Sequence, residues 1–174
     1  MTNMGVILYK IRKTTAADTS AVAWLHVRTF NEAHAPETQD GPPIEVREYQ
    51  WRKILTKNDP YDFCIVIESE AGELIGFARG VKHNDNPNYK GALNKIYILE
   101  QYHRQGLGRQ LICAVTREFL ALGISSMLLF GDADSDANRF YEALGGEKLY
   151  TSEGRFDGSY GWRNLRALGE LCGS

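Results

Sequence analysis

The chain has 174 residues, of which 43% are hydrophobic and 24% charged, a mixture typical of a globular domain. Its formal net charge is −2, with 20 basic against 22 acidic residues, so the overall charge gives no reason to expect a nucleic acid or an anionic membrane as partner. No apolar run approaches the roughly 20 residues that cross a bilayer. We therefore expect one cytoplasmic domain over residues 1–174.

The first half of the chain predicts a strand, two helices and then three strands, over residues 6–12, 17–31, 44–55, 63–68, 74–81 and 93–99. In the first helix, Val22, Leu25 and Phe30 recur at near-helical spacing. The second helix is expected to stop at Asn58-Asp59-Pro60, because proline lacks an amide hydrogen and disfavours helix before it.

The second half predicts a helix, a buried strand, a short helix and two short strands, over residues 106–122, 124–130, 136–144, 148–151 and 160–165. Apolar residues advance by four from Leu107 to Phe119, which is the pattern of an amphipathic helix. We expect Asp134 or Ser135 to cap the short helix and Gly145-Gly146 to end it. Antiparallel pairs mixed with crossover helices indicate an α/β fold with a mixed sheet.

The three cysteines are Cys64, Cys113 and Cys172, an odd number of widely separated residues with no CxxC or Cys/His spacing. This pattern favours reduced, structural thiols over a disulfide framework or a zinc site. We accordingly expect no metal.

A glycine turn between a strand and a long helix is the most informative segment, LNKIYILEQYHRQGLGRQLICAVTREFL over residues 93–120. Gly106 and Gly108 let the backbone turn sharply, and the amides at a helix start bind phosphate oxygens. Arg104 and Arg109 are placed to add charge-assisted bonds. Neither a P-loop lysine nor the third glycine of a dinucleotide fingerprint is present. Taken alone, such a turn also fits a purely structural helix start.

Two sequence motifs, one of them containing this turn, resemble those of a known protein family. HRQGLGR resembles the acetyl-CoA pyrophosphate loop of the GNAT superfamily, (Gln/Arg)-x-x-Gly-x-(Gly/Ala), with His103 at the Gln/Arg position. GDADSDANRFYEALGG, residues 131–146, resembles the later family motif N-x-x-A-x-x-(F/L)-Y-x-x-x-G, with Asp134 in place of asparagine. The resemblance covers roughly residues 5–165. It implies the GNAT fold, a mixed central sheet with splayed middle strands flanked by helices.

The resemblance also implies acetyl-CoA as co-substrate. In this family the strand before the loop pairs through its backbone with the pantetheine arm, a role that falls to Ile96, Tyr97 and Ile98. The loop amides hold the pyrophosphate. The remaining implied cofactor residues are Arg104, Gln105, Gly106, Leu107, Gly108, Arg109 and Asp134.

For catalysis, the resemblance implies that Tyr141 protonates the departing CoA thiolate as a general acid, the alternative being a core aromatic role beside Phe140. The general base stays unassigned. The splayed strand offers no carboxylate before Glu100, and we weigh His83 and Asp132 against solvated surface roles.

The acceptor in this family lies between the first two helices and the splayed strands. Candidates for contact with it are Phe30, His34 and Trp51, together with Asn31, Tyr97, Tyr160 and Trp162. We expect an N-acetyltransferase that moves an acetyl group to a primary amine of a small molecule or peptide by direct attack. The alternatives are a non-catalytic acyl-CoA-binding sensor and a transferase for longer acyl groups. A homodimer is compatible with the family.

Overall fold

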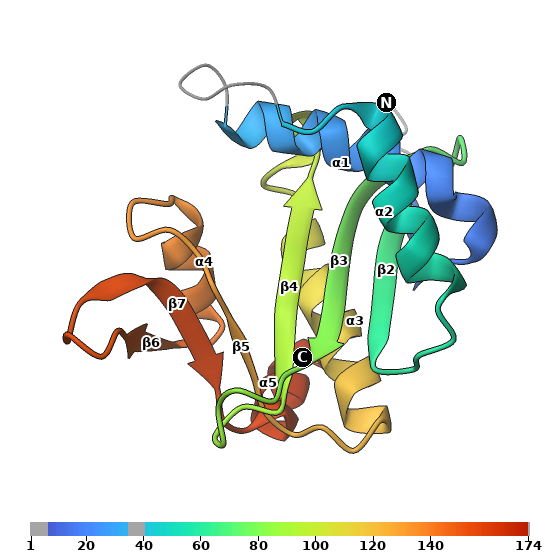
Figure 1. The fold of residues 1–174 in the computed structure, drawn as a ribbon. Helices are drawn as coiled ribbons and strands as arrows, with labels where there is room; N and C mark the ends of the chain where they lie inside the picture. The colour runs from blue at the N-terminus through green and yellow to red at the C-terminus, as the bar shows by residue number, and fades with distance from the viewer. Residues whose placement is uncertain (1–6, 35–40, 174) are drawn as a thin grey trace, which may run out of the picture. The chain divides into compact units, whose positions relative to one another are not determined.

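The computed structural model describes residues 7–34 and 41–173, and it confirms the α/β class (Figure 1). The sheet is mixed and seven-stranded, in the order β1-β2-β3-β4-β5-β7-β6. The strands are β1 (Lys10–Lys13), β2 (Asp62–Glu68), β3 (Leu74–Lys82), β4 (Gly91–Ile98), β5 (Met127–Leu129), β6 (Glu147–Tyr150) and β7 (Phe156–Trp162). The helices are α1 (Thr19–His34), α2 (Ile44–Thr56), α3 (Leu107–Ala121), α4 (Ala137–Ala143) and α5 (Leu165–Cys172), with short 3-10 turns η1 (Ala16–Asp18) and η2 (Glu100–Tyr102).

The expected order of elements is confirmed, but the strand predicted over 124–130 is shorter. Gly123 has a φ of 77°, and the amide of Ile124 donates to the carbonyl of Phe119 at 2.8 Å. This is the hydrogen bond of a glycine-terminated helix end, so Ile124 completes α3 instead of starting β5. Phe130, at the other end of the predicted run, is exposed.

The C-terminal part of the chain holds an element that the sequence analysis missed. The strand predicted over 160–165 lies earlier, as β7, and α5 follows it. The side chain of Asn164 accepts hydrogen bonds from the amides of Arg166 and Ala167, which caps α5 at its start. Leu165 and Leu168 bury the inner face of this helix.

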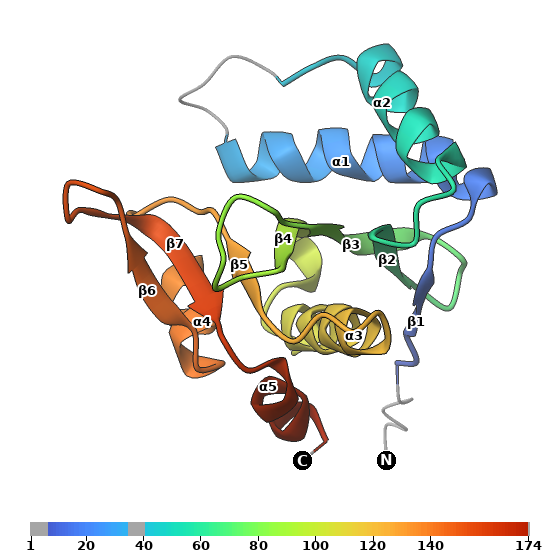
Figure 2. The same ribbon diagram turned by 60° about the horizontal axis from the view of Figure 1, so that its bottom comes forward.

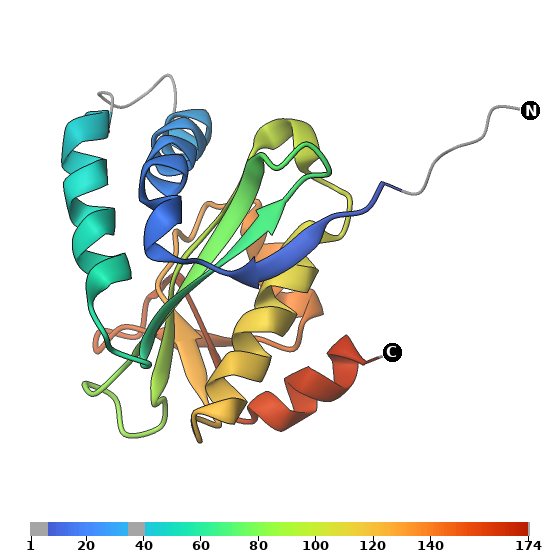
Figure 3. The ribbon, with the colours of Figure 1, turned by 90° about the vertical axis from the view of Figure 1, so that its right-hand side faces the viewer.

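The described chain forms two compact units, and β2, β3, β4 and α3 each contribute residues to both. Of the described residues, the first comprises 7–34, 41–58, 64–77 and 96–111, and the second comprises 59–63, 78–95 and 112–173. In the first unit α1 and α2 lie side by side (Figures 1 and 3). The interpretation of residues 1–174 as one domain stays a prediction.

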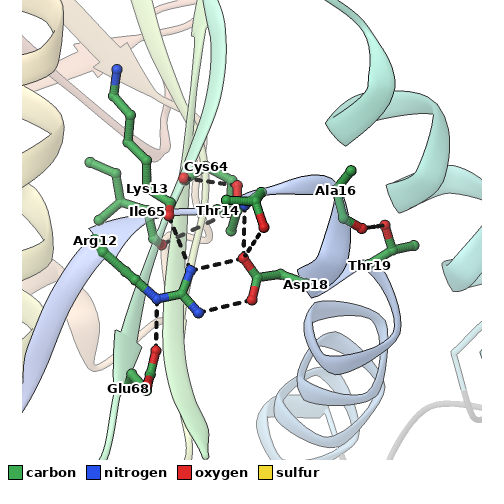
Figure 4. A network of polar contacts seen from close by, with 10 residues as sticks. Arg12, Lys13, Thr14, Ala16, Asp18, Thr19, Cys64, Ile65 and Glu68 are labelled. Carbon is green, nitrogen blue, oxygen red and sulfur yellow. Dashed lines mark hydrogen bonds and ion pairs between the residues drawn. The ribbon is translucent and has the colours of Figure 1, made fainter. Parts of the chain in front are cut away.

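An arginine joins three elements of the first unit (Figure 4). The guanidinium of Arg12 on β1 donates to both carboxylate oxygens of Asp18 in η1, at 2.8 and 2.9 Å, and to Glu68 on β2 at 2.7 Å. β1 pairs antiparallel with β2, with Ile11 opposite Ile67. Hydrogen bonding from Arg12 lowers the pKa of Asp18. The turn that leads into α1 is thus fixed to the edge of the sheet.

A disulfide in the second unit corrects the expectation of reduced thiols. Cys113 on α3 and Cys172 on α5 are bonded across 59 residues of sequence, with their Cα atoms 5.7 Å apart. Figures 2 and 3 show α5 beside α3. Cysteine spacing could not reveal this proximity, because it depends on a helix that was not predicted. Cys64 is buried and takes no part in the disulfide.

No helix within 7–34 or 41–173 is both long enough and apolar enough to cross a membrane.

Candidate active site

The strand before the glycine turn leaves its parallel neighbour early. β4 pairs with β5 at Gly91 opposite Met127 and at Ala92 opposite Leu128, and then continues to Ile98. The end of this short ladder is the splay of the middle strands that the resemblance implied. Ile96, Tyr97 and Ile98, the predicted pantetheine contacts, therefore lie beyond the part of β4 that pairs with β5.

The turn between β4 and α3 has the backbone geometry of an anion site. Arg104 and Gly106 have φ values of 62° and 76°, so left-handed residues flank Gln105. Such alternation turns successive amides toward one point. The first hydrogen bond of α3 joins the amide of Gln110 to the carbonyl of Gly106 at 3.2 Å. The amides of Leu107 and Gly108 precede it and have no acceptor within the helix, so they are placed for phosphate oxygens.

His103 ties this turn to the strand. Its Nε2 lies 2.8 Å from the carbonyl oxygen of Ile98, and because a carbonyl only accepts, the ring nitrogen donates. The amide of His103 donates to Glu100 at 3.0 Å and that of Tyr102 to Leu99 at 2.9 Å. Hydrogen bonds within residues 98–103 therefore fix the conformation of the segment between β4 and the glycine turn.

The other side chains of the turn differ in burial. Arg104, Gln105 and Arg109 are exposed, whereas Leu107 is buried and anchors the start of α3. Gln105 accepts a hydrogen bond from the hydroxyl of Tyr9 at 2.8 Å. The two arginines lie at the positive end of a helix of 15 residues, where an anion is favoured.

The segment before α4 is folded around Asp132. Its carboxylate accepts from the amide of Asp134 at 2.9 Å, and the side chain of Asn138 donates to the carbonyl of Asp132 at 3.0 Å. The expected N-cap was wrong, because Asp136 occupies that position without a side-chain capping bond. Ser135 still accepts from the amide of Ala137. Asp134 itself is exposed.

Tyr141 lies in an aromatic cluster of the second unit. Its ring centroid is 5.5 Å from that of Tyr160 and 6.3 Å from that of Trp162. Tyr160 donates to Glu142 at 2.9 Å, and burial raises its pKa to about 12. The indole of Trp162 donates to the carbonyl of Leu144 at 3.0 Å. Tyr160 and Trp162 are thus buried residues whose polar groups are bonded to α4 and its end.

A second aromatic cluster fills the first unit. Trp51 on α2 donates from Nε1 to Nδ1 of His26 on α1 at 3.1 Å, and both residues are buried. Since an indole nitrogen only donates, Nδ1 of His26 accepts and the ring proton is on Nε2. Tyr97 lies 5.8 Å from His26 and 5.7 Å from Phe77 between ring centroids. Burial raises the pKa of Tyr97.

The other predicted acceptor residues meet at the end of α1. The rings of Phe30 and His34 stack with centroids 4.2 Å apart, and Nδ1 of His34 donates to the carbonyl of Phe30 at 2.9 Å. The guanidinium of Arg47 on α2 lies 5.4 Å from the Phe30 ring centroid. The structure therefore brings Phe30 to His34, and Trp51 to His26.

Two residues of these clusters were missed in the sequence analysis. His26 lies four residues after Val22, on the buried stripe of α1, and Arg47 lies four residues before Trp51 on α2. A spacing of four places each pair on one helix face. This spacing was the sequence signal that could have predicted the burial of His26 and Arg47. The general base stays unassigned. Asp132 and Glu100 are exposed, and the ring centroid of His83 lies 6.0 Å from that of Phe130. Within the described ranges, no group of three His, Cys, Asp or Glu residues is arranged to hold a metal ion.

Comparison with known proteins gives consistent matches. The model of the Acetyltransferase (GNAT) family matches residues 19–146. The uncharacterized N-acetyltransferase YuaI of Bacillus subtilis (strain 168) is 27% identical over 172 residues, covering 92% of this chain and 96% of YuaI. A mycothiol acetyltransferase of Kocuria rhizophila is 31% identical over 136 residues, which is 74% of this chain but 43% of the relative. The solved aminoglycoside N-acetyltransferase AAC(6')-Iy, in complex with CoA, shares the fold at a TM-score of 0.71 and 19% identity, over 85% of this chain and 93% of the other.

Proposed function

This chain belongs to the GNAT family of acetyltransferases, and from that premise we propose that it moves the acetyl group of acetyl-CoA to a primary amine of a small molecule or peptide. The observation that carries this proposal is the turn after β4. Left-handed Arg104 and Gly106, followed at once by the start of α3, form an amide-lined anion site. A relative named as an N-acetyltransferase and a similar fold with CoA bound support the same assignment.

The turn fits the charge and shape of a CoA pyrophosphate. The amides of residues 104–109 would contact its oxygens, with the side chains of Arg104 and Arg109 adding positive charge. The backbone of Ile96, Tyr97 and Ile98 would pair with the pantetheine arm, because β4 has left β5 there. We keep Asp134 as a further contact, since it is exposed in the loop before α4.

The proposed reaction is direct attack. The neutral amine nitrogen forms a bond to the thioester carbonyl carbon, the carbon–sulfur bond breaks, and the CoA sulfur leaves with the bonding electrons. The proton lost by the amine goes to water or to a base, and Tyr141 donates its phenol proton to the sulfur. Phe30, His34 and Trp51, with the neighbours His26 and Tyr97, are the proposed acceptor contacts.

Turnover tests this function. The purified protein is incubated with acetyl-CoA and a panel of amines, amino acids and short peptides, while CoA release and product mass are followed. We expect CoA release that depends on the amine and a product heavier by one acetyl group. Binding of acetyl-CoA without turnover of any amine would instead favour the sensor. Propionyl-CoA and succinyl-CoA in the same assay identify the acyl group that is used.

A further inference from the structure

Arg47 is a buried cation without an anionic partner in the described part of the chain. Its exposed fraction is 8%, and none of the ion pairs there involves it. One guanidinium nitrogen, Nη1, donates to the side-chain oxygen of Gln50 at 3.2 Å. Another, Nε, is buried and has no hydrogen-bond partner. Burial accordingly lowers the pKa of Arg47.

Two other partly buried arginines, Arg12 and Arg79, do have carboxylate partners. Arg12 is bonded to two carboxylates, those of Asp18 and Glu68 (Figure 4). The guanidinium of Arg79 donates hydrogen bonds to both carboxylate oxygens of Asp62, each at 2.8 Å. A buried charge is costly unless it is paired, and buried polar groups without partners are rare. The exception at Arg47 is therefore best explained by an anion that residues 7–34 and 41–173 do not supply, namely one carried by a ligand.

The surroundings of Arg47 define the kind of anion. Its guanidinium lies over the face of Phe30, and its charge acts on the hydroxyl of Tyr97, lowering the pKa of that group against the rise caused by burial. Gln50, Phe30 and Tyr97 are neutral side chains at neutral pH, so the site offers a single positive charge. A planar guanidinium with free donors matches the two oxygens of a carboxylate. A doubly charged phosphate would find no second cation among these neighbours.

We propose that Arg47 binds a carboxylate of the acceptor, so that the acetylated amine belongs to an amino acid or a similar amino-carboxylate. This inference rests on the proposed function, because Phe30 and Tyr97 are the acceptor contacts argued above. The carboxylate is bound and stays unchanged. The new bond forms between the amine nitrogen and the acetyl carbon, as the carbon–sulfur bond of the thioester breaks.

Matched pairs of acceptors test the proposal. Amino acids and their primary amides are compared as substrates of the wild-type protein and of Arg47→Met and Arg47→Lys. We expect wild-type kcat/KM for the acids to exceed that for the amides at least tenfold. Arg47→Met should remove this preference by raising KM for the acids at least tenfold more than KM for the amides. Arg47→Lys, which keeps the charge but not the planar fork, should retain part of the preference.

A second measurement uses only the wild-type protein, in case Arg47→Met fails to fold. Carboxylic acids that match the acceptors but lack the amine should inhibit competitively against the acceptor, and their amides should not. Equal turnover of acids and amides, or equal inhibition by both, would overturn the role of Arg47 while leaving the acetyltransferase function intact. No acetyl-CoA turnover with any amine would instead count against the function itself.

Discussion

The imidazole of His103 donates a hydrogen bond from Nε2 to the carbonyl oxygen of Ile98, 2.8 Å away. His103 stands where the family motif usually has glutamine or arginine, and the bond shows what its side chain does there. The bond links the start of the glycine turn to Ile98, the last residue of β4, and so fixes the segment between them. Glutamine and arginine also carry a nitrogen donor, so the substitution keeps the chemistry of the position.

Replacing His103 should affect the proposed cofactor site according to donor capacity. His103→Gln can still donate to Ile98, and we expect its KM for acetyl-CoA to stay close to wild type. His103→Ala loses the bond and should raise that KM about two- to tenfold, the equivalent of the roughly 0.5–1.5 kcal/mol that one hydrogen bond contributes. Steady-state kinetics at saturating amine measure this. An identical change in both variants would show that the bond does not support the site.

Tyr141→Phe tests the general acid. We expect kcat to fall at least tenfold, within the roughly 10²–10⁴-fold that such catalysis contributes, while acetyl-CoA affinity is nearly unchanged. Tyr160→Phe is the matched control, because it removes a neighbouring buried hydroxyl that bonds Glu142. That variant should lose about 1 kcal/mol of stability and keep its kcat. Full activity of Tyr141→Phe would exclude Tyr141 from the reaction.

The disulfide should stabilise the second unit. It closes a loop with a sequence separation of 59 residues, and constraint of the unfolded chain on that scale contributes about 2–4 kcal/mol. Dithiothreitol, or the variant Cys113→Ser/Cys172→Ser, should therefore lower Tm in thermal unfolding monitored by circular dichroism. Once that variant is made, dithiothreitol should lower its Tm no further. An unchanged Tm for the wild-type protein on reduction would contradict the prediction.

The Arg12–Asp18 pair predicts a pH-dependent contribution to stability. Hydrogen bonding from Arg12 lowers the folded-state pKa of Asp18 below its unfolded value. Stability from this shift is complete above the unfolded pKa of about 3.9 and is lost as the pH falls through the folded pKa. Asp18→Asn should cost about 1–2 kcal/mol at pH 7, and the difference from wild type should shrink below about pH 4. Urea unfolding at a series of pH values measures it, and a difference that is constant with pH would argue against the pair.

Long periodic segments were predictable from the sequence, and short irregular ones were not. The four-residue apolar spacing from Leu107 to Phe119 gave α3 within a residue or so, because a helix face must match the 3.6-residue period. The late start of β5 depended on the left-handed Gly123, and α5 depended on the capping side chain of Asn164. The conformation of a single residue set each of these boundaries. The apolar runs over 124–130 and 160–165 therefore predicted the wrong strand limits.

The candidate site was predictable where a motif fixes backbone geometry. The turn at Gly106 and the start of α3 lie where the sequence predicted them, and their binding of a cofactor stays a prediction. The surroundings of Arg47 and His26 were not predicted, because α1 and α2 carry no motif and their packing partners are far away in sequence. An unpaired buried arginine can be recognised only when the burial and the partners of every arginine are known.

The most direct test of the account is calorimetric titration of the purified protein with acetyl-CoA, with ATP and NAD as controls and Gly108→Val as the matched variant. We expect the wild-type protein to bind acetyl-CoA and neither control nucleotide. Folded Gly108→Val should lose this binding, because a branched side chain would crowd the amides proposed to hold the pyrophosphate. Absence of acetyl-CoA binding to the folded wild-type protein, or normal binding by Gly108→Val, would contradict the assignment of the turn after β4.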